Sequence, residues 1–145
     1  MHTFFVNTDG GARGNPGPEG VGVVISDESG KTLKKISRAI GETTNNAAEY
    51  EGVLTALTEL KKMIPQNRRA ETELLFKLDS ELVVKQLNGE YQVKDEPLQF
   101  LFMKIWNMRV AHFSHMTFAH VPREENRGAD ALVNEAIDTA TRKLL

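Results

Sequence analysis

The stretch Thr-Phe-Phe-Val-Asn-Thr-Asp-Gly-Gly, residues 3–11, is the starting point for predicting the fold. Its aromatic and β-branched residues predict a strand over residues 3–9, and the glycines that follow predict a turn. This strand therefore ends in a carboxylate, Asp9. A second apolar run, predicted as a strand over residues 73–78, is followed directly by Asp79. Catalytic groups gather at the ends of parallel strands, so we expect Asp9 and Asp79 to share a site.

Two further acids lie on the apolar faces of predicted helices. Glu49 belongs to the inward stripe of the helix predicted over residues 46–63, and Asp130 lies in the first turn of the last helix, beside an apolar stripe. Both carboxylates should point toward the sheet, so four acids are expected to converge. The first stripe contains Glu49, Val53, Ala56, Leu57, Leu60 and Ile64, and the second contains Ala129, Val133, Ala136, Ile137, Ala140 and Leu144.

Such a convergence needs positive charge, because a like-charge pair about 4 Å apart costs roughly 4 kcal/mol at an effective dielectric near 20. Oxygen ligands suit a hard cation, Mg²⁺ or Mn²⁺, and several carboxylates can hold two ions about 3.5 to 4 Å apart across a reacting phosphate. The pattern therefore favours phosphoryl-transfer chemistry. The alternative, that each acid is an ordinary strand-end or helix-start residue, is the commoner case for any one acid alone.

The length and composition exclude several classes of site. A chain of 145 residues fits one domain, residues 1–145, and the absence of cysteine excludes disulfides, thiolate zinc sites and cysteine nucleophiles. The four histidines show no HExxH spacing, and we interpret His112 and His115 as a surface pair at a helix end. Neither a signal peptide nor an apolar run of roughly 18 residues is found, so we expect a soluble, cytoplasmic monomer that does not enter membranes.

The net charge of -2 and the pI near 6.1 would ordinarily argue against a nucleic-acid partner. Setting the four site carboxylates aside leaves a slight positive balance, without a basic arm or tail. We therefore expect any affinity for nucleic acid to be modest and salt-sensitive.

The order of the predicted elements indicates an α/β fold. Three antiparallel strands come first, a long helix crosses over to a fourth strand parallel to the first, and two helices precede a fifth strand. A C-terminal helix follows, with Asn126 as a plausible N-cap. Trp106 could stack on a base, but inside an apolar helix core packing is the favoured interpretation. The predicted strands are residues 3–9, 21–25, 32–40, 73–78 and 116–121, and the predicted helices before the last strand are residues 46–63, 80–87 and 96–111.

Four motifs follow one another in this framework. They are Thr8-Asp-Gly-Gly-Ala-Arg-Gly-Asn-Pro-Gly17, Thr44-Asn-Asn-Ala-Ala-Glu49, Leu78-Asp-Ser80 and Asn126-Arg-Gly-Ala-Asp130. In this order and spacing, the chain resembles ribonuclease H of type 1 along nearly its whole length. Any one motif would be weak support, whereas four in sequence are not expected by chance.

The resemblance implies a ribonuclease H-like fold with a five-stranded mixed sheet, three antiparallel strands then two parallel, flanked by helices. It also implies that Asp9, Glu49, Asp79 and Asp130 are catalytic, metal-binding carboxylates. The expected substrate is the RNA strand of an RNA/DNA hybrid. The expected reaction is phosphodiester hydrolysis with two ions, Mg²⁺ or Mn²⁺, leaving 5′-phosphate and 3′-hydroxyl ends, and Asp9 is expected to bridge both ions.

The resemblance also suggests substrate contacts near the first motif. Glycines let the backbone approach a nucleic-acid strand closely, so Gly10 and Gly11 could offer backbone groups to the ribose, and Asn15 would contact substrate. For Asn15 the alternative is an ordinary turn residue. The loop is not a Walker loop, since it lacks GxxxxGK[ST].

The residues before Glu49 are expected to recognise RNA. Thr44 is assigned to a phosphate, and Asn45 and Asn46 to the minor groove, including the 2′-hydroxyl that separates RNA from DNA. Ser80 would assist. Helix capping is the alternative and could account for Thr44 or Asn45, but hardly for all three residues.

The chain departs from many relatives in two places. Many relatives carry a histidine in a flexible loop before the last Asp, whereas His120 lies inside a predicted strand and is interpreted as structural. Arg123, as a substrate contact, or Glu124 would then take part of that loop's role. A basic protrusion after the third motif is also missing. The cations that could compensate for it, or that are simply solvated surface residues, are Lys85, Lys94 and Arg13.

Two other functions fit parts of the pattern. A junction resolvase of the same broad fold would need dimerisation and no 2′-hydroxyl recognition, and the Thr44-Asn45-Asn46 triplet and the lack of an evident dimer helix speak against it. A binding module that has lost catalysis would have no reason to keep four mutually repelling acids.

Overall fold

The computed structural model describes residues 1–14 and 17–143. Strands and helices alternate after an initial three-stranded meander. In chain order the elements are β1 (His2–Ala12), β2 (Gly17–Ser26), β3 (Thr32–Thr43), α1 (Asn45–Met63), η1 (Gln66–Glu71), β4 (Thr72–Leu78), α2 (Glu81–Leu87), α3 (Glu96–Ala111), β5 (His115–His120), η2 (Arg123–Asn126) and α4 (Arg127–Lys143). The two elements marked η are short 3₁₀ helices.

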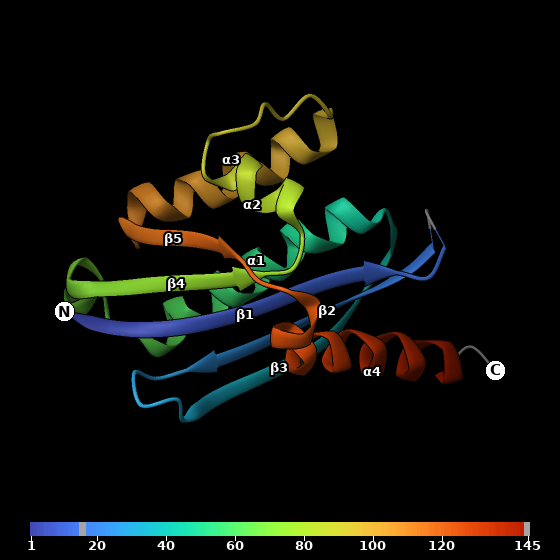
Figure 1. Cartoon of the computed structure of the whole chain (residues 1–145), viewed down its shortest axis with the longest axis horizontal. Coiled ribbons are helices and arrows are strands. Elements are labelled where there is room, and N and C mark those ends of the chain that lie inside the picture. Colours follow the sequence, from blue (N-terminus) through green and yellow to red (C-terminus); the bar gives the residue numbers. More distant parts are fainter. Residues whose placement is uncertain (15–16, 144–145) are drawn as a thin grey trace.

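The strands form one mixed sheet in the order β3-β2-β1-β4-β5 (Figure 1). The pairs β1–β2 and β2–β3 are antiparallel, whereas β1–β4 and β4–β5 are parallel. A parallel neighbour requires a crossover, and α1 supplies it between β3 and β4. The predicted sheet of three antiparallel strands followed by two parallel ones is confirmed.

Helices cover both faces of this sheet, as Figure 1 shows for α1 and α4. On each face of the sheet, the backbone of a helix lies very close to the backbone of a strand. A Cβ on Gly10 would lie 2.0 Å from the carbonyl oxygen of Ala48 in α1, and one on Gly22 would lie 2.0 Å from that of Ala129 in α4. Glycine at these positions therefore lets each helix lie directly against the strands.

The main core lies between the sheet and α1, with α2 and α3 closing it. Its largest fully buried side chains include Tyr50, Phe76 and Phe113. The inward stripe predicted for α1 is buried throughout, as are Ala129, Val133, Ala136 and Ile137 of α4. Leu144, the last residue of the predicted α4 stripe, lies outside the described residues.

The prediction that Trp106 packs in the core is wrong, because 47% of its side chain is exposed. Leu98 and Ile105 are the buried residues of α3. Apolar residues also occur on the outer face of this helix, so its apolar character alone did not show where Trp106 lies. The exposed face holds Phe100, Met103, Trp106 and Val110.

Most element boundaries differ from the predicted ones by a few residues. β1, β2 and β3 each extend beyond the predicted ends, and the polar linker expected at residues 66–69 is part of η1. Within the described residues, none of the helices combines the length and apolar character that crossing a membrane would require.

Candidate active site

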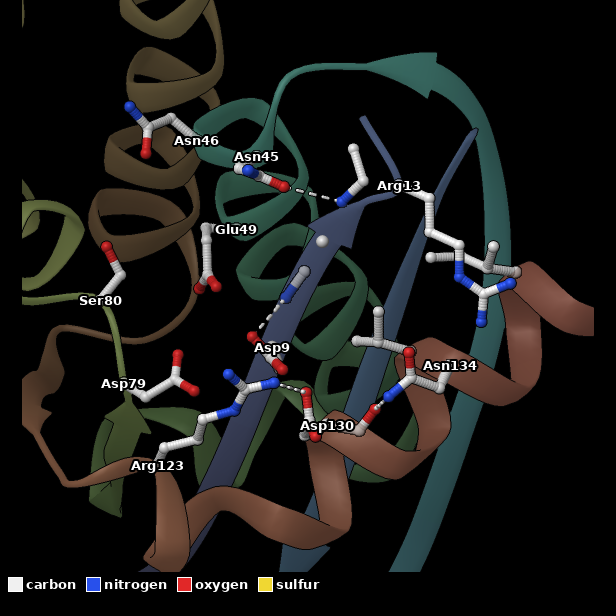
Figure 2. Close-up of a pocket in the computed structure, with 15 residues that line it drawn as sticks. Asp9, Arg13, Asn45, Asn46, Glu49, Asp79, Ser80, Arg123, Asp130 and Asn134 are labelled. Atoms are coloured by element: carbon white, nitrogen blue, oxygen red, sulfur yellow. Dashed lines mark hydrogen bonds and ion pairs between the residues drawn. The ribbon is translucent and has the colours of Figure 1, made fainter. Parts of the chain in front are cut away.

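A cavity of about 600 Å³ opens where the carboxyl ends of β1 and β4 meet the N-termini of α1 and α2 (Figure 2). We call it the cleft. The parallel pairing of Asn7 with Lys77 places Asp9 and Asp79, each two residues further along, at the same edge of the sheet. All four predicted carboxylates line the cleft.

Two glycines bring Glu49 to Asp9. A Cβ on Gly10 would overlap the backbone of Ala48, and a Cβ on Gly52 would lie 2.9 Å from the carbonyl oxygen of Asp9. Helix α1 therefore packs against the end of β1 more closely than larger residues would allow. Glu49 lies between these contacts, so its side chain meets the Asp9 carboxylate.

Asp9, Glu49 and Asp79 each offer an oxygen atom within 4.8 Å of the other two. Burial, together with the charges of Asp79 and Asp130, raises the pKa of Asp9 to about 7, against a hydrogen bond with Glu49 that lowers it. Burial, followed by a hydrogen bond to Asp9, raises the pKa of Glu49 well above its usual value. The metal-free pair therefore retains a proton near neutral pH.

The chemistry of these groups fits a hard divalent cation. Three carboxylates from separate parts of the chain, in β1, in α1 and just after β4, form the cluster, and Oε2 of Glu49 is buried without a hydrogen-bond partner among the described residues. A bound cation would satisfy this oxygen and would offset both the burial and the repulsion that raise the pKa values. The residues present are therefore able to hold Mg²⁺ or Mn²⁺.

Asp130 approaches the same cluster from the first turn of α4 but lies outside the group of oxygens within 4.8 Å. Its Oδ1 pairs with Nη2 of Arg123 at 3.6 Å (Figure 2). The pKa of Asp79 is raised by burial and by Asp130, and the charge of Arg123 lowers it in part. Arg123 thus supplies positive charge next to the carboxylates.

Comparison with known proteins identifies the family. Residues 7–136 match the family described as reverse transcriptase-like. The structure of LC11-RNase H1, isolated from compost by a metagenomic approach, superposes with a TM-score of 0.91 at 48% identity, covering 97% of this chain and 99% of that one. The chain belongs to the type 1 ribonuclease H family.

Other relatives of this family are more distant in sequence. A bifunctional protein of Mycobacterium tuberculosis is 36% identical over 138 residues, covering 94% of this chain, and the ribonuclease HI of Halobacterium salinarum is 35% identical over 140 residues, covering 97%. The match spans 36% of the mycobacterial protein and 65% of the halobacterial one. A crystal structure of LC11-RNase H1 in complex with an RNA/DNA hybrid has a TM-score of 0.88 at 46% identity, covering 95% of this chain and 99% of that one.

The residues that the ribonuclease H resemblance assigns to substrate lie around the carboxylates, with two exceptions. Gly10, Gly11, Asn45, Asn46, Ser80 and Arg123 line the cleft. Thr44 is not among the lining residues, and its hydroxyl accepts a hydrogen bond from the backbone N–H of Ala47, which is the capping alternative. Asn15 lies outside the described residues.

Two of the lining polar residues also have structural contacts. Oδ1 of Asn45 accepts a hydrogen bond of 2.8 Å from the backbone N–H of Ala12, which ties the start of α1 to the end of β1. The hydroxyl of Ser80 accepts from the backbone N–H of Val83 and caps α2. Both residues therefore help to shape the cleft.

Asn126 is buried, with only 1% of its side chain exposed. Its Nδ2 donates to the carbonyl oxygen of Thr8 at 2.9 Å, and its Oδ1 accepts from Nδ2 of Asn7 at 3.1 Å. The side chain thus holds η2 and the start of α4 against β1, next to Asp9. The sequence analysis predicted Asn126 as a helix N-cap and did not predict these hydrogen bonds, because they join residues about 118 positions apart in the chain.

The sequence prediction missed Asn134, which lines the cleft one turn after Asp130 on the same helix. Arg13, named as a possible compensating cation, also lines the cleft and pairs with Asp138. The helical spacing of Asp130 and Asn134 could have indicated that both face the cleft.

Two residues near the departures from the family pattern lie close to the carboxylates. His120 ends β5, pairs in register with Leu78, is exposed, and contributes to lowering the pKa of Asp79. Glu124 lines a smaller adjoining pocket together with Arg123, Arg127 and Asp130. The structural role predicted for His120 and the loop role suggested for Glu124 stay predictions.

Proposed function

We propose that the protein is a metal-dependent ribonuclease H that hydrolyses the RNA strand of RNA/DNA hybrids. The observation that carries this proposal is the cluster of Asp9, Glu49 and Asp79 within 4.8 Å, from separate parts of the chain, in the cleft of a type 1 ribonuclease H fold. The complex of LC11-RNase H1 with a hybrid supports the same substrate class.

The four carboxylates would hold two ions, Mg²⁺ or Mn²⁺, with Asp9 contributing to both. When bound, the ions would activate a water and stabilise the leaving 3′ oxygen, so that 5′-phosphate and 3′-hydroxyl ends result. The chain must first release the proton held by Asp9 and Glu49, because only carboxylates bind these ions well. Mildly basic pH should therefore favour activity.

Arg123 would orient the phosphate next to the carboxylates. The Arg123 side chain is 76% exposed and its guanidinium already lies beside Asp130, so it can exchange that partner for a phosphate oxygen without a large rearrangement. Asn45 and Asn46, at the opposite wall of the cleft in Figure 2, would read the minor groove and the 2′-hydroxyl of the RNA strand. The backbone of Gly10 and Gly11 would lie against the ribose, and Ser80 would assist.

The direct test is a comparison of substrates with Mg²⁺ or Mn²⁺ present. Matched RNA/DNA hybrid, double-stranded RNA, double-stranded DNA and branched DNA are incubated with the protein, and the ends of the products are mapped. The proposal requires cleavage of the RNA strand of the hybrid, with 5′-phosphate ends. Cleavage of branched DNA alone would favour a junction resolvase, and binding without cleavage would favour a module that has lost catalysis.

A further inference from the structure

A second concave surface lies between the edge strand β3 and helix α1. Its volume is about 390 Å³, and we call it the β3–α1 groove. Among the described residues, four cationic residues and one carboxylate, Glu59, contribute to its lining. The cations are Lys34, Lys35, Arg38 and Lys62. The side chains of Lys34 and Arg38 lie on the α1 face of β3, whereas Lys35 alternates to the other face.

The walls of the groove are regular elements, so the charges have defined positions. Nη1 of Arg38 donates to the hydroxyl of Thr55 at 3.3 Å, and Nζ of Lys34 pairs with Glu59 at 3.5 Å. Lys34 and Arg38 are four residues apart on β3, hence about 13 Å apart. Thr55, Thr58, Glu59 and Lys62 follow one face of α1.

The cations of the cleft are arranged differently. Arg13 and Arg123 line the cleft, and both form ion pairs, with Asp138 and Asp130 respectively. The cleft also holds the carboxylate cluster, and the whole chain carries a net charge of -2. A polyanion is therefore repelled by the metal-free cleft and attracted by the groove.

We infer that the β3–α1 groove binds the phosphate backbone of nucleic acid and holds a segment of substrate outside the cleft. Ammonium, guanidinium and hydroxyl donors suit phosphate oxygens, which are contacted without regard to sequence. Of the described residues, none with an aromatic ring that could stack a base lines the groove, and Ile36, the one large apolar residue among them, is half-buried. Such a lining offers no pocket for the aromatic or aliphatic anchor of a protein partner.

The inference rests on the proposed function, because it assigns the groove to the same nucleic acid. Along α1, the groove begins ten residues after Asn45 and ends at Lys62, hence roughly 15 to 25 Å from the cleft wall. A hybrid that fills only the cleft would not reach it. A longer hybrid, or a second hybrid molecule, would reach the groove.

The test measures binding without metal, so that it does not depend on turnover. The protein in EDTA is titrated with a labelled RNA/DNA hybrid of about 30 base pairs at several salt concentrations. The groove variant combines Lys34→Gln, Arg38→Gln and Lys62→Gln, and the control variant removes the same charge elsewhere through Lys104→Gln, Arg142→Gln and Lys143→Gln. Thermal unfolding checks that both variants keep the midpoint of the unaltered protein.

We expect the groove variant to lose about tenfold or more in affinity at low salt, and the slope of log K against log salt to fall by about 2 to 3, since each phosphate contact contributes roughly 0.7 to 0.9. The control variant should stay within about twofold of the unaltered protein. Equal losses in both variants, or no binding by the unaltered protein, would overturn the inference. The inference would also be overturned if the groove variant still bound the hybrid but no longer bound an acidic peptide. Absence of hybrid cleavage with metal would instead contradict the proposed function and leave the binding result standing.

Discussion

Helix α1 lines both the cleft and the β3–α1 groove, but with different turns, and the two sites carry opposite charges. Glu49, in the second turn, joins two buried or half-buried aspartates, and the pKa values of all three rise. The groove places exposed lysines along β3 and the last turns of α1. Charges in the cleft are therefore controlled by burial, and charges in the groove by solvent and salt.

The largest expected effect comes from the cleft. Asp9→Asn removes an oxygen from the carboxylate cluster and should lower the rate of hybrid cleavage by more than about 100-fold, because changing groups that merely support a metal ligand already costs 10- to 100-fold. In metal-free buffer the same change, or Asp79→Asn, should leave the midpoint of thermal unfolding equal or higher, since repulsion is relieved.

Asp27→Asn provides the matched control for this prediction. The pKa of Asp27 is lowered by hydrogen bonds from Ser29 and from backbone N–H groups in the β2–β3 turn. Its replacement should therefore reduce stability and leave cleavage unchanged. A marked loss of stability in Asp9→Asn, comparable to that in Asp27→Asn, would contradict the account of the cluster.

Arg123→Ala should have a smaller effect on the cleft. The variant loses one charged contact to phosphate, and we expect a decrease in kcat of about tenfold, equivalent to roughly 1.4 kcal/mol. Arg123→Lys keeps the charge and should recover part of the loss, measured on the same hybrid. Unchanged kcat in Arg123→Ala would remove this residue from the proposed site.

Glu19 tests whether burial alone can raise a pKa outside the cleft. It lies in β2 with 3% of its side chain exposed, Oε2 has no hydrogen-bond partner, and burial with the charge of Glu51 raises its pKa from 4.5 to about 7. The folded state therefore keeps a proton that the unfolded chain loses above about pH 4.5. Stability should fall as pH rises from about 4.5 to 7.

Glu19→Gln should abolish this dependence. Compared with the unaltered protein, the variant is expected to have a similar free energy of unfolding at about pH 4 and one roughly 1 to 3 kcal/mol higher at about pH 8. Urea unfolding at both pH values measures the difference, and Glu51→Gln should weaken the pH dependence only in part, because its charge adds to the effect of burial on Glu19. A variant that is less stable at the higher pH would contradict the assignment of a buried, partnerless carboxylate.

The smallest effect is expected in the groove. Glu59→Gln removes the single carboxylate of the groove and its ion pair with Lys34, so stability should change by less than about 1 kcal/mol. Affinity for the hybrid without metal should rise about two- to threefold, because one repulsive charge is gone. Weaker binding would argue against a phosphate-binding role.

Much of the fold could be predicted because local patterns agreed with the final structure. The period-two strands, the inward stripe of α1 and the acids at the ends of β1 and β4 gave the sheet order and brought Asp9, Glu49 and Asp79 to one place. The expectation for Trp106 was wrong because it rested only on the apolar character of its helix. Apolar residues also occupy the outer face of α3, and packing against α1 leaves Trp106 outside.

Other features of the site depend on contacts between distant segments. The hydrogen bonds of Asn126 to β1 and the approach of Gly52 to Asp9 are set by tertiary packing, and no local pattern predicts them. Glu19 is a different case. It alternates with Val21, Val23 and Ile25 on one face of β2, so strict period-two reading would have indicated a buried acid.

The central claim is that Asp9 and Glu49 share a proton which a divalent cation displaces. Calorimetric titration with Mn²⁺ at about pH 6.5, in two buffers of different ionisation enthalpy, counts the protons released on binding. We predict saturable binding that releases protons in the unaltered protein and releases fewer in Asp9→Asn. Binding without proton release, or no binding at all, would contradict this account of the site.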